Sequence, residues 1–205
     1  MLVKLAKQVV DWQIRKEYLP KEERALYEYA YEALLNQVLN ISIAILIALW
    51  MHAALPVFVF LVSYIPLRSY CGGYHARTHG GCTILSTLLI LGVCMLEKAI
   101  TEGSFIGLHY TTRDIFDMIV MMAIVFGISG SIIFRFAPVA DSNKPLDEEE
   151  TVHYRRQGKV LWLIETCVGL LLCIWFRRAA LIVGISHLVL SIILCLGIIK
   201  QRIEK

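Results

Sequence analysis

The stretch IFDMIVMMAIVFGISGSIIFRFA (Ile115–Ala137) has charged residues only near its ends, Asp117 and Arg135. The apolar run between them is close to the length of a membrane-spanning helix, which needs about 20 residues within a range of roughly 17–25. In lipid, a single segment satisfies its backbone hydrogen bonds only as an α-helix. This stretch therefore predicts an all-α integral membrane protein.

The whole chain agrees with this prediction. Of its 205 residues, 58% are hydrophobic and only 18% are charged, which is too little polar surface for a soluble domain. Leu55–Leu67 is too short for a full span and is interpreted as a re-entrant or tilted half-helix. We favour six spans, with four full spans plus partial helices as the alternative. The other apolar segments are 36–51, 83–99, 160–176 and 179–199.

Residues 1–35 predict two amphipathic N-terminal helices, at 2–17 and from Lys21 to about Leu35. In the first, Leu2, Leu5 and Trp12 recur at helical spacing, while basic residues take other faces. This pattern suits a helix that lies on an anionic membrane surface. The alternative is an ordinary helix that packs on its neighbours.

The distribution of basic residues predicts the orientation in the cell membrane. Sixteen of the twenty lysines and arginines fall before residue 36, in 68–79, in 135–159 or after 199. By the positive-inside rule these regions are cytoplasmic, and so are both termini and the 68–82 loop. The Arg177-Arg178 pair is the exception, because it would face outward. A net charge of only +3 argues against nucleic acid as a partner.

We expect a single membrane domain over residues 1–205. An apolar hairpin at 36–67 leads into a catalytic loop at 68–82, and 83–205 holds the remaining spans. A polar cytoplasmic loop is predicted at 138–159, because two prolines interrupt it near its start. The glutamates at 148–150 are predicted to begin a helix there, since anionic side chains suit a helix N-terminus.

The segment RSYCGGYHARTHGGC (Arg68–Cys82) carries the candidate chemistry. A cysteine attacks a carbonyl as its thiolate, so it needs a neighbouring base, and His75 can take the proton of Cys82 and return it to a leaving amine. On an unbroken helix the two residues would lie about 10 Å apart along the axis. We therefore expect the chain to turn between them, with Gly80-Gly81 supplying the freedom, or the pair to meet across a dimer.

Other residues of this segment have two interpretations each. Gly72 and Gly73 either let backbone amides approach a developing oxyanion or simply form a turn. Arg68 either binds an acidic substrate group or the thiolate, or anchors the chain at the membrane interface.

A metal site is the competing interpretation of the segment. Cys71, His75, His79 and Cys82 have the ligand types of tetrahedral zinc. A protein built this way would be a non-enzymatic, zinc-stabilised transporter or scaffold. The peptidase interpretation needs no cofactor. The single histidines His52, His109 and His187 are expected to be structural.

The combination of Arg68, Gly72-Gly-Tyr-His-Ala76 and Cys82 among apolar segments resembles the accessory gene regulator B (AgrB) family of membrane cysteine endopeptidases. The later stretch Ala137-Pro-Val and Asn143-Lys-Pro-Leu146 is similar to that family's polar loop. The resemblance extends over essentially the whole chain.

This resemblance implies that the protein processes an AgrD-like precursor peptide in Gram-positive quorum sensing. Such enzymes remove an acidic C-terminal tail and close the remainder into a thiolactone or lactone. By similarity, His75 and Cys82 are the catalytic residues, and Lys144 and Pro145 match positions linked to processing. The resemblance also implies a homodimer.

Overall fold

A computed structural model describes the chain at residues 2–74, 76, 78–101, 115–139 and 146–203. This part of the chain is helical, apart from one isolated β-bridge between Gly72 and Val139. The prediction of an all-α protein is therefore confirmed. The α-helices are α1 (Leu2–Arg15), α2 (Arg24–Trp50), α3 (Ala54–Cys71), α4 (His79–Thr101), α5 (Ile115–Phe136), α6 (Glu148–Trp175) and α7 (Arg177–Ile203), with a short 3₁₀ helix at Lys21–Glu23 before α2.

Helices α2 to α7 are each long and apolar enough to cross a membrane. The shortest of them, α3, has 18 residues, which is within the range of roughly 17–25 that a span requires. The chain is therefore a multi-pass membrane protein with six candidate spans. This agrees with the favoured of the two predicted arrangements.

Two predicted boundaries were wrong, for opposite reasons. The helix predicted at 21–35 and the span at 36–51 form one helix, α2, because neither glycine nor proline occurs between Arg24 and Trp50 to end it. The short segment 55–67 is part of a longer helix, because α3 continues through polar residues to Cys71 and tolerates Pro66 inside it. A membrane helix extends further than its apolar run when its polar end is covered by protein.

The two predicted loops are shorter than expected. Helix α3 ends at Cys71 and α4 begins at His79, so Arg68 lies in the last turn of α3 and Cys82 in the first turn of α4. The polar segment predicted at 138–159 is helical from Glu148 onward. The predicted helix start at 148–150 is confirmed, and the loop residues 140–145 lie outside the described part of the chain.

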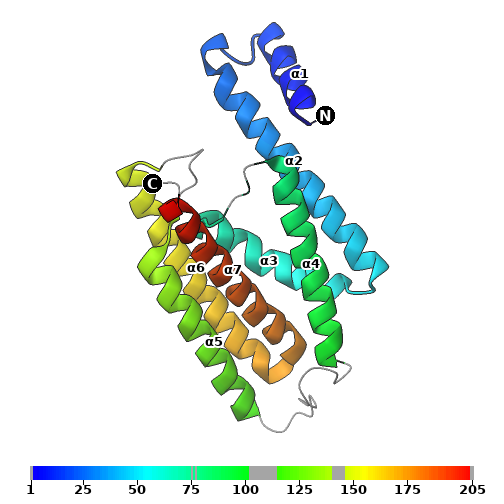
Figure 1. Cartoon of the computed structure of the whole chain (residues 1–205), viewed down its shortest axis with the longest axis vertical. Helices are drawn as coiled ribbons and strands as arrows, with labels where there is room; N and C mark the ends of the chain where they lie inside the picture. The colour runs from blue at the N-terminus through cyan, green and yellow to red at the C-terminus, as the bar shows by residue number, and fades with distance from the viewer. Residues whose placement is uncertain (1, 75, 77, 102–114, 140–145, 204–205) are drawn as a thin grey trace.

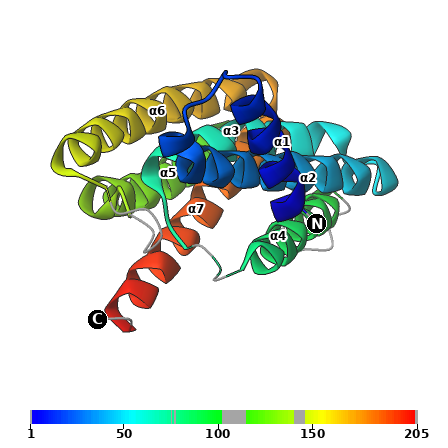
Figure 2. The ribbon, with the colours of Figure 1, turned by 90° about the horizontal axis from the view of Figure 1, so that it is seen from above.

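The helices form two groups that α3 joins. Helices α5, α6 and α7 pack against one another, while α2 packs with α1 and α4. Seen from above, α5 and α6 lie on one side, α1, α2 and α4 lie on the other, and α3 reaches across (Figure 2). Both termini lie toward the upper end in Figure 1, and the reversal between α6 and α7 lies at the lower end.

The α5–α7 bundle packs closely because large side chains cover small residues on the facing helices. The Trp162 ring lies against Gly130, Phe126 lies against Gly169, and Met122 lies against Gly184. Contacts between small and large residues drive helix association in lipid, where the hydrophobic effect offers little. The bundle thus gives α3 and the segment after it a firm base.

Helix α1 uses two apolar faces. Ala6 and Val10 are completely buried against α2, whereas Leu5 and Trp12 are about half exposed. The helix therefore packs on its neighbour and still presents apolar side chains outward. An outward apolar face of this kind suits a membrane surface.

The start of α6 offers a test of local stability. Asp147 caps the helix, since its carboxylate accepts a hydrogen bond from the Glu150 amide at 2.7 Å. We expect Asp147→Ala to lower the free energy of unfolding by about 1 kcal/mol, because the cap is lost. Asp147→Asn should retain most of it. Thermal unfolding of both variants in detergent measures the difference, and an equal loss in both would contradict the capping role.

Candidate active site

Residues 72–74 connect α3 to the start of the candidate site. Gly72 ends α3 with a φ of 71° and a ψ of −143°, a backbone conformation that glycine adopts readily and that other residues rarely do. The Val139 amide donates to the Cys71 carbonyl at 2.9 Å, and the Gly73 amide donates to the Val139 carbonyl at 3.3 Å. The polar segment after α5 is therefore attached directly to the segment after α3.

Arg68 holds the same segment from inside. Its guanidinium donates to the Tyr74 carbonyl at 2.6 Å and to the Gly72 carbonyl at 3.3 Å. One rigid fork therefore fixes two carbonyls on either side of Gly73. These contacts give Arg68 a role in positioning the backbone of residues 72–74, and its predicted roles toward substrate, thiolate or membrane interface stay predictions.

Helix α7 supports the opposite side of residues 72–74. The Tyr74 amide donates to the Ile193 carbonyl at 2.9 Å. Gly197 approaches so closely that an added Cβ would lie 2.8 Å from the Tyr74 nitrogen. The ammonium group of Lys200 lies 5.5 Å from the centre of the Tyr74 ring. The backbone that leads into position 75 is thus held by α3, by the segment after α5 and by α7.

Cys82 lies in the first turn of α4 and is half-buried. Its amide donates to the Thr78 carbonyl at 3.1 Å, and the Thr78 hydroxyl accepts from the Gly81 amide at 3.1 Å. The positive end of a helix dipole favours an anion, here a thiolate, at this position. The start of α4 therefore supplies a suitable environment for a nucleophilic sulfur.

Cys82 lines a cavity of about 580 Å³ between α2, α3, α4 and α7. Sites for small ligands measure about 300–1,000 Å³ and combine apolar walls with a few polar groups. Here the walls are mainly aliphatic, and Gln37, Asn40, Arg68 and Ser86 also line the cavity. The Asn40 Oδ1 atom is buried and accepts no hydrogen bond from the described residues. The cavity has the size and composition to hold part of a peptide.

The structure brings several of the predicted site residues together. Arg68, Gly72 and Cys82 line the same cavity, and Gly73 is held directly beside Arg68. His75, Lys144 and Pro145 lie outside the described residues. Val139 is the last described residue before 140–145, and it pairs with Gly72. The segment that leads to His75 and the segment that leads to Lys144 and Pro145 are therefore joined by this bridge.

The glycines of this region act within the chain's own backbone, and Gly72 turns the chain at the end of α3, as one of the two interpretations considered for it has it. The amides of Gly72 and Gly73 donate to the carbonyls of Arg68 and Val139, so both are engaged within the chain. Gly80 and Gly81 belong to α4, and the change of direction occurs before them, within 72–78. The expectation that Gly80-Gly81 makes the turn was therefore wrong, because the Thr78 hydroxyl and carbonyl bond the amides of 81 and 82 and start the helix earlier.

The four proposed zinc ligands are not all described, since His75 and the side chain of His79 fall outside. Cys71 is fully buried, and its sulfur lies against Gly158 of α6. It does not line the cavity that Cys82 lines. Among the described side chains, no group of three or more metal-ligating residues occurs.

Residues of α2 were missed in the sequence, notably Gln37 and Asn40. They lie on the long apolar helix, where a single amide gives no motif. The available signal was that Asn36, Gln37, Asn40 and Ser42 are the polar residues of an otherwise apolar run. Polar residues at such depth usually face protein or a water-filled cavity.

The Arg68 contacts predict how the segment responds to substitution. We expect Arg68→Met to increase hydrogen exchange at the amides of 72–74 at least ~10-fold, since a hydrogen bond from a charged group contributes about 1.5–3 kcal/mol. Arg68→Lys should restore little, because an ammonium lacks the planar fork. Exchange measured by mass spectrometry tests this, with the exposed Arg156→Met as control. Unchanged exchange in Arg68→Met would contradict the role.

Comparison with known proteins matches the chain to one family model and to several relatives. The family model described as Accessory gene regulator B matches residues 4–203. A protein named "Putative AgrB-like protein" from Clostridium perfringens (strain SM101) is 29% identical over 140 residues, which cover 68% of this chain and 61% of that protein. A Listeria monocytogenes (strain EGD-e) protein of the same name is 26% identical over 193 residues, covering 93% and 87%. The match thus spans about three-fifths of the Clostridium relative. No solved structure matches the chain significantly.

Proposed function

Because the chain belongs to the accessory gene regulator B family, we propose that it is a membrane cysteine endopeptidase that processes an AgrD-like precursor peptide for quorum sensing. It removes the C-terminal tail of the precursor and closes the remainder into a thiolactone or lactone autoinducing peptide. The observation that carries this proposal is the placement of Cys82 at a helix start, lining a cavity of peptide-binding size. His75 is the proposed base.

The first half of the reaction is cleavage. His75 takes the thiol proton of Cys82, and the thiolate attacks the carbonyl carbon of the precursor's scissile peptide bond. The tetrahedral intermediate collapses as the C–N bond breaks, and His75 returns the proton to the departing amine. The tail leaves with a free N-terminus, and the rest of the precursor remains as a thioester on Cys82.

The second half is ring closure. A thiol or hydroxyl within the bound peptide loses its proton to His75 and attacks the thioester carbonyl, and the Cys82 thiol is released with that proton. Exchange between two thioesters yields little free energy, so the ring must form faster than water attacks. Holding the peptide nucleophile beside the acyl carbon provides this advantage. Mainly aliphatic cavity walls support it by limiting water.

The supporting residues act on the backbone near the base. Arg68, Gly72 and Gly73 position the segment that leads into His75, as the contacts to the carbonyls of Gly72 and Tyr74 support. Lys144 and Pro145 are proposed to assist processing by similarity alone. Their attachment through Val139 to Gly72 makes a role near the site physically reasonable.

We place the site at the cytoplasmic face of the cell membrane, with both termini on the same side. The positive-inside distribution supports this, and an even number of spans is compatible with it. An amphipathic precursor would reach the site along the lipid surface, where α1 presents Leu5 and Trp12. A homodimer is proposed from the family resemblance.

A reconstituted reaction tests the proposal. Purified full-length protein in lipid vesicles is incubated with a synthetic precursor that has an amphipathic N-terminal part and an acidic tail, and the products are followed by mass spectrometry. We expect a free tail and a chain that carries the remaining peptide as a thioester, which hydroxylamine releases. A thiol alkylator should stop both, and a chelator should stop neither. No release of the tail under any of these conditions, together with zinc bound to the purified protein, would instead favour the zinc-stabilised transporter or scaffold.

A further inference from the structure

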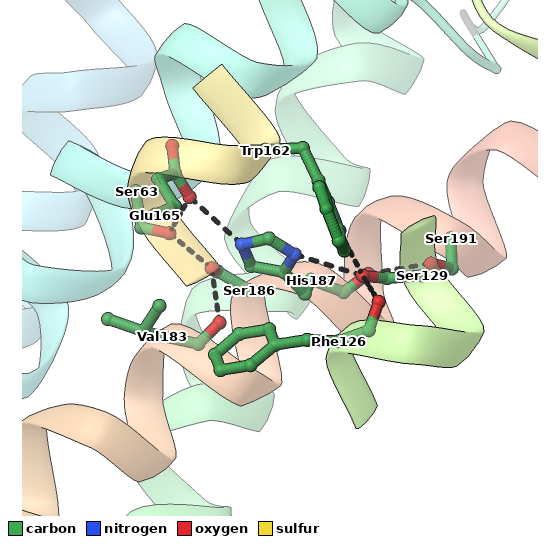
Figure 3. Close-up of polar contacts among 9 residues, drawn as sticks. All are labelled: Ser63, Phe126, Ser129, Trp162, Glu165, Val183, Ser186, His187 and Ser191. Carbon is green, nitrogen blue, oxygen red and sulfur yellow. Dashed lines mark hydrogen bonds and ion pairs between the residues drawn. The ribbon is translucent and has the colours of Figure 1, made fainter. Parts of the chain in front are cut away.

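A group of polar side chains lies inside the helix bundle, outside the cavity that Cys82 lines (Figure 3). Glu165 comes from α6 and His187 from α7, both from the middle of their helices. Ser63 of α3 and Ser129 of α5 complete the group. His187 is fully buried, and the Glu165 side chain is 13% exposed. Two ionisable groups therefore meet at a depth where lipid surrounds the bundle.

The contacts form one continuous chain of hydrogen bonds. His187 Nε2 lies 3.1 Å from Glu165 Oε2, and His187 Nδ1 lies 3.0 Å from the Ser129 oxygen. The Ser63 hydroxyl donates to the same carboxylate oxygen at 2.6 Å. The Trp162 indole donates to the Ser129 oxygen at 3.0 Å. The imidazole is thus held between a carboxylate and a hydroxyl.

The surroundings give Glu165 little other compensation for its charge. A carboxylate within a membrane span is expensive, and such residues are rare and usually functional. The titratable group facing it from α3 is the buried thiol of Cys71, which interacts with it electrostatically but brings no positive charge. The charged residues of the packed helices lie toward the helix ends: Arg68 on α3; Glu97 and Lys98 on α4; Asp117 and Arg135 on α5; Glu148, Glu149, Glu150, Arg155, Arg156 and Lys159 on α6; Arg177, Arg178, Lys200 and Arg202 on α7.

The hydrogen bonds between these side chains limit where protons can lie in the site, and two arrangements of the protons are consistent with them. A hydroxyl has one proton, and Ser129 can donate it to the Phe126 carbonyl at 3.0 Å. The Ser129 oxygen then accepts from Trp162 and from His187 Nδ1–H. With a proton on Nδ1, the contact between Nε2 and Glu165 requires one more proton between them. The pair is then neutral overall, either as imidazolium with carboxylate or as imidazole with carboxylic acid.

A rotation of the Ser129 hydroxyl gives the second arrangement. When Ser129 donates to His187 Nδ1, the imidazole keeps its only proton on Nε2 and donates it to the Glu165 carboxylate. Every contact to the imidazole and carboxylate remains made, although the pair has lost a proton and carries one negative charge. The two arrangements differ by one proton and by the direction of one hydroxyl.

We propose that Glu165 and His187 form a reversible proton-binding site within the membrane, with Ser129 as the hydroxyl that adjusts to the loaded and unloaded states. The ligand is a proton, and the coupled pair binds it as a unit. This role goes beyond the peptidase function and does not depend on it.

The position of the site connects it to the candidate active site. Ser63, which bonds Glu165, lies on the same helix as Arg68, and His187 lies on the same helix as Ile193. Arg68 and Ile193 are the residues that hold the Tyr74 backbone. A change of charge where α3, α6 and α7 meet therefore acts on the two helices, α3 and α7, that hold Tyr74.

Nitrogen NMR of the full-length protein in lipid vesicles, labelled with ¹⁵N-histidine, tests the site. In spectra recorded from about pH 9 to pH 5, we expect His187 Nδ1 to gain a proton on acidification. His187→Gln identifies the signal. Glu165→Gln should weaken proton affinity at least ~10-fold, because the carboxylate that stabilises the added charge is gone. Ser191→Ala is the matched control, because this buried α7 serine donates only to the His187 carbonyl.

The outcomes are decisive without any measurement of peptidase activity. A His187 Nδ1 signal that stays constant over the whole range would overturn the proposal, and so would a titration that Glu165→Gln leaves unchanged. If His187→Gln fails to fold, the shift in Glu165→Gln makes the assignment instead. The connection to the active site is tested by hydrogen exchange at 72–74. Glu165→Gln should match the wild type at low pH and differ at high pH, and identical exchange at both would refute the connection.

Discussion

Cys82→Ser is expected to reduce precursor cleavage at least ~10³-fold, since removal of a catalytic nucleophile typically has an effect of this size or larger. Serine preserves the volume at the cavity wall, yet a hydroxyl is a far weaker nucleophile than a thiol beside a histidine. The chain should still fold, because Cys82 lies on the cavity rim and not in a packed core. Mass spectrometry of the tail and of the acyl-enzyme measures both halves of the reaction.

The matched control for this variant is Cys167→Ser. Cys167 is exposed on α6, away from the cavity, so its loss should leave the cleavage rate unchanged. Equal expression of both variants excludes a folding defect. Continued cleavage by the Cys82 variant at the wild-type rate would refute the proposed mechanism.

Gly72→Ala is expected to have the second largest effect. An added Cβ would overlap the Val139 carbonyl oxygen, and the φ of 71° disfavours any side chain. The Val139 oxygen is a backbone atom, so it cannot move away without disturbing the Gly72–Val139 bridge. We expect a loss of about 3 kcal/mol or more in the free energy of unfolding, since strain and overlap add. Cleavage should fall as well, because residues 73 and 74 lead directly into His75.

Gly92→Ala provides the control for this variant. Gly92 lies within α4, and a Cβ added there would meet no atom within 4 Å. Alanine there should stabilise the helix by as much as about 1 kcal/mol. The unfolding temperature should therefore fall in Gly72→Ala and rise in Gly92→Ala, and only Gly72→Ala should lose cleavage. A Gly72 variant as stable as the Gly92 variant would contradict the assigned role of the bridge.

The membrane-spanning helices could be predicted because each is encoded locally. An apolar run such as Ile115–Ala137 has one stable form in lipid, and its neighbours do not alter that. The predicted helix boundaries were wrong where a helix extends beyond its apolar run. The polar stretch before Val38 continues α2 without a break, and the four residues after Leu67 extend α3. Helix ends depend on capping and on burial by protein, which hydropathy does not report.

The sequence indicates candidate residues for the site but not the backbone contacts that support them. Cys82 and Arg68 stand in a recognisable segment, whereas Val139 and Ile193 bond the same loop through backbone atoms alone. A carbonyl or an amide has no identity in the sequence, so such contacts have no motif. His187 is similar: alone in its helix it suggested a structural role, and its acidic partner Glu165 lies on the preceding helix.

The limited contact between the two groups of helices has a consequence for how a peptide reaches the cavity. Helices α2 and α4 wall the cavity, yet they rest on α3 and touch the α5–α7 bundle only slightly, through α7. Moving this pair outward would separate the buried apolar cluster that α2 and α4 share with α3 and α7, and it would leave the packing among α5, α6 and α7 intact. A lipid-bound chain could thus enter sideways, between two helices, and never cross the aqueous phase. For the proposed peptidase, the precursor would then enter from the lipid phase through the side of the helix bundle.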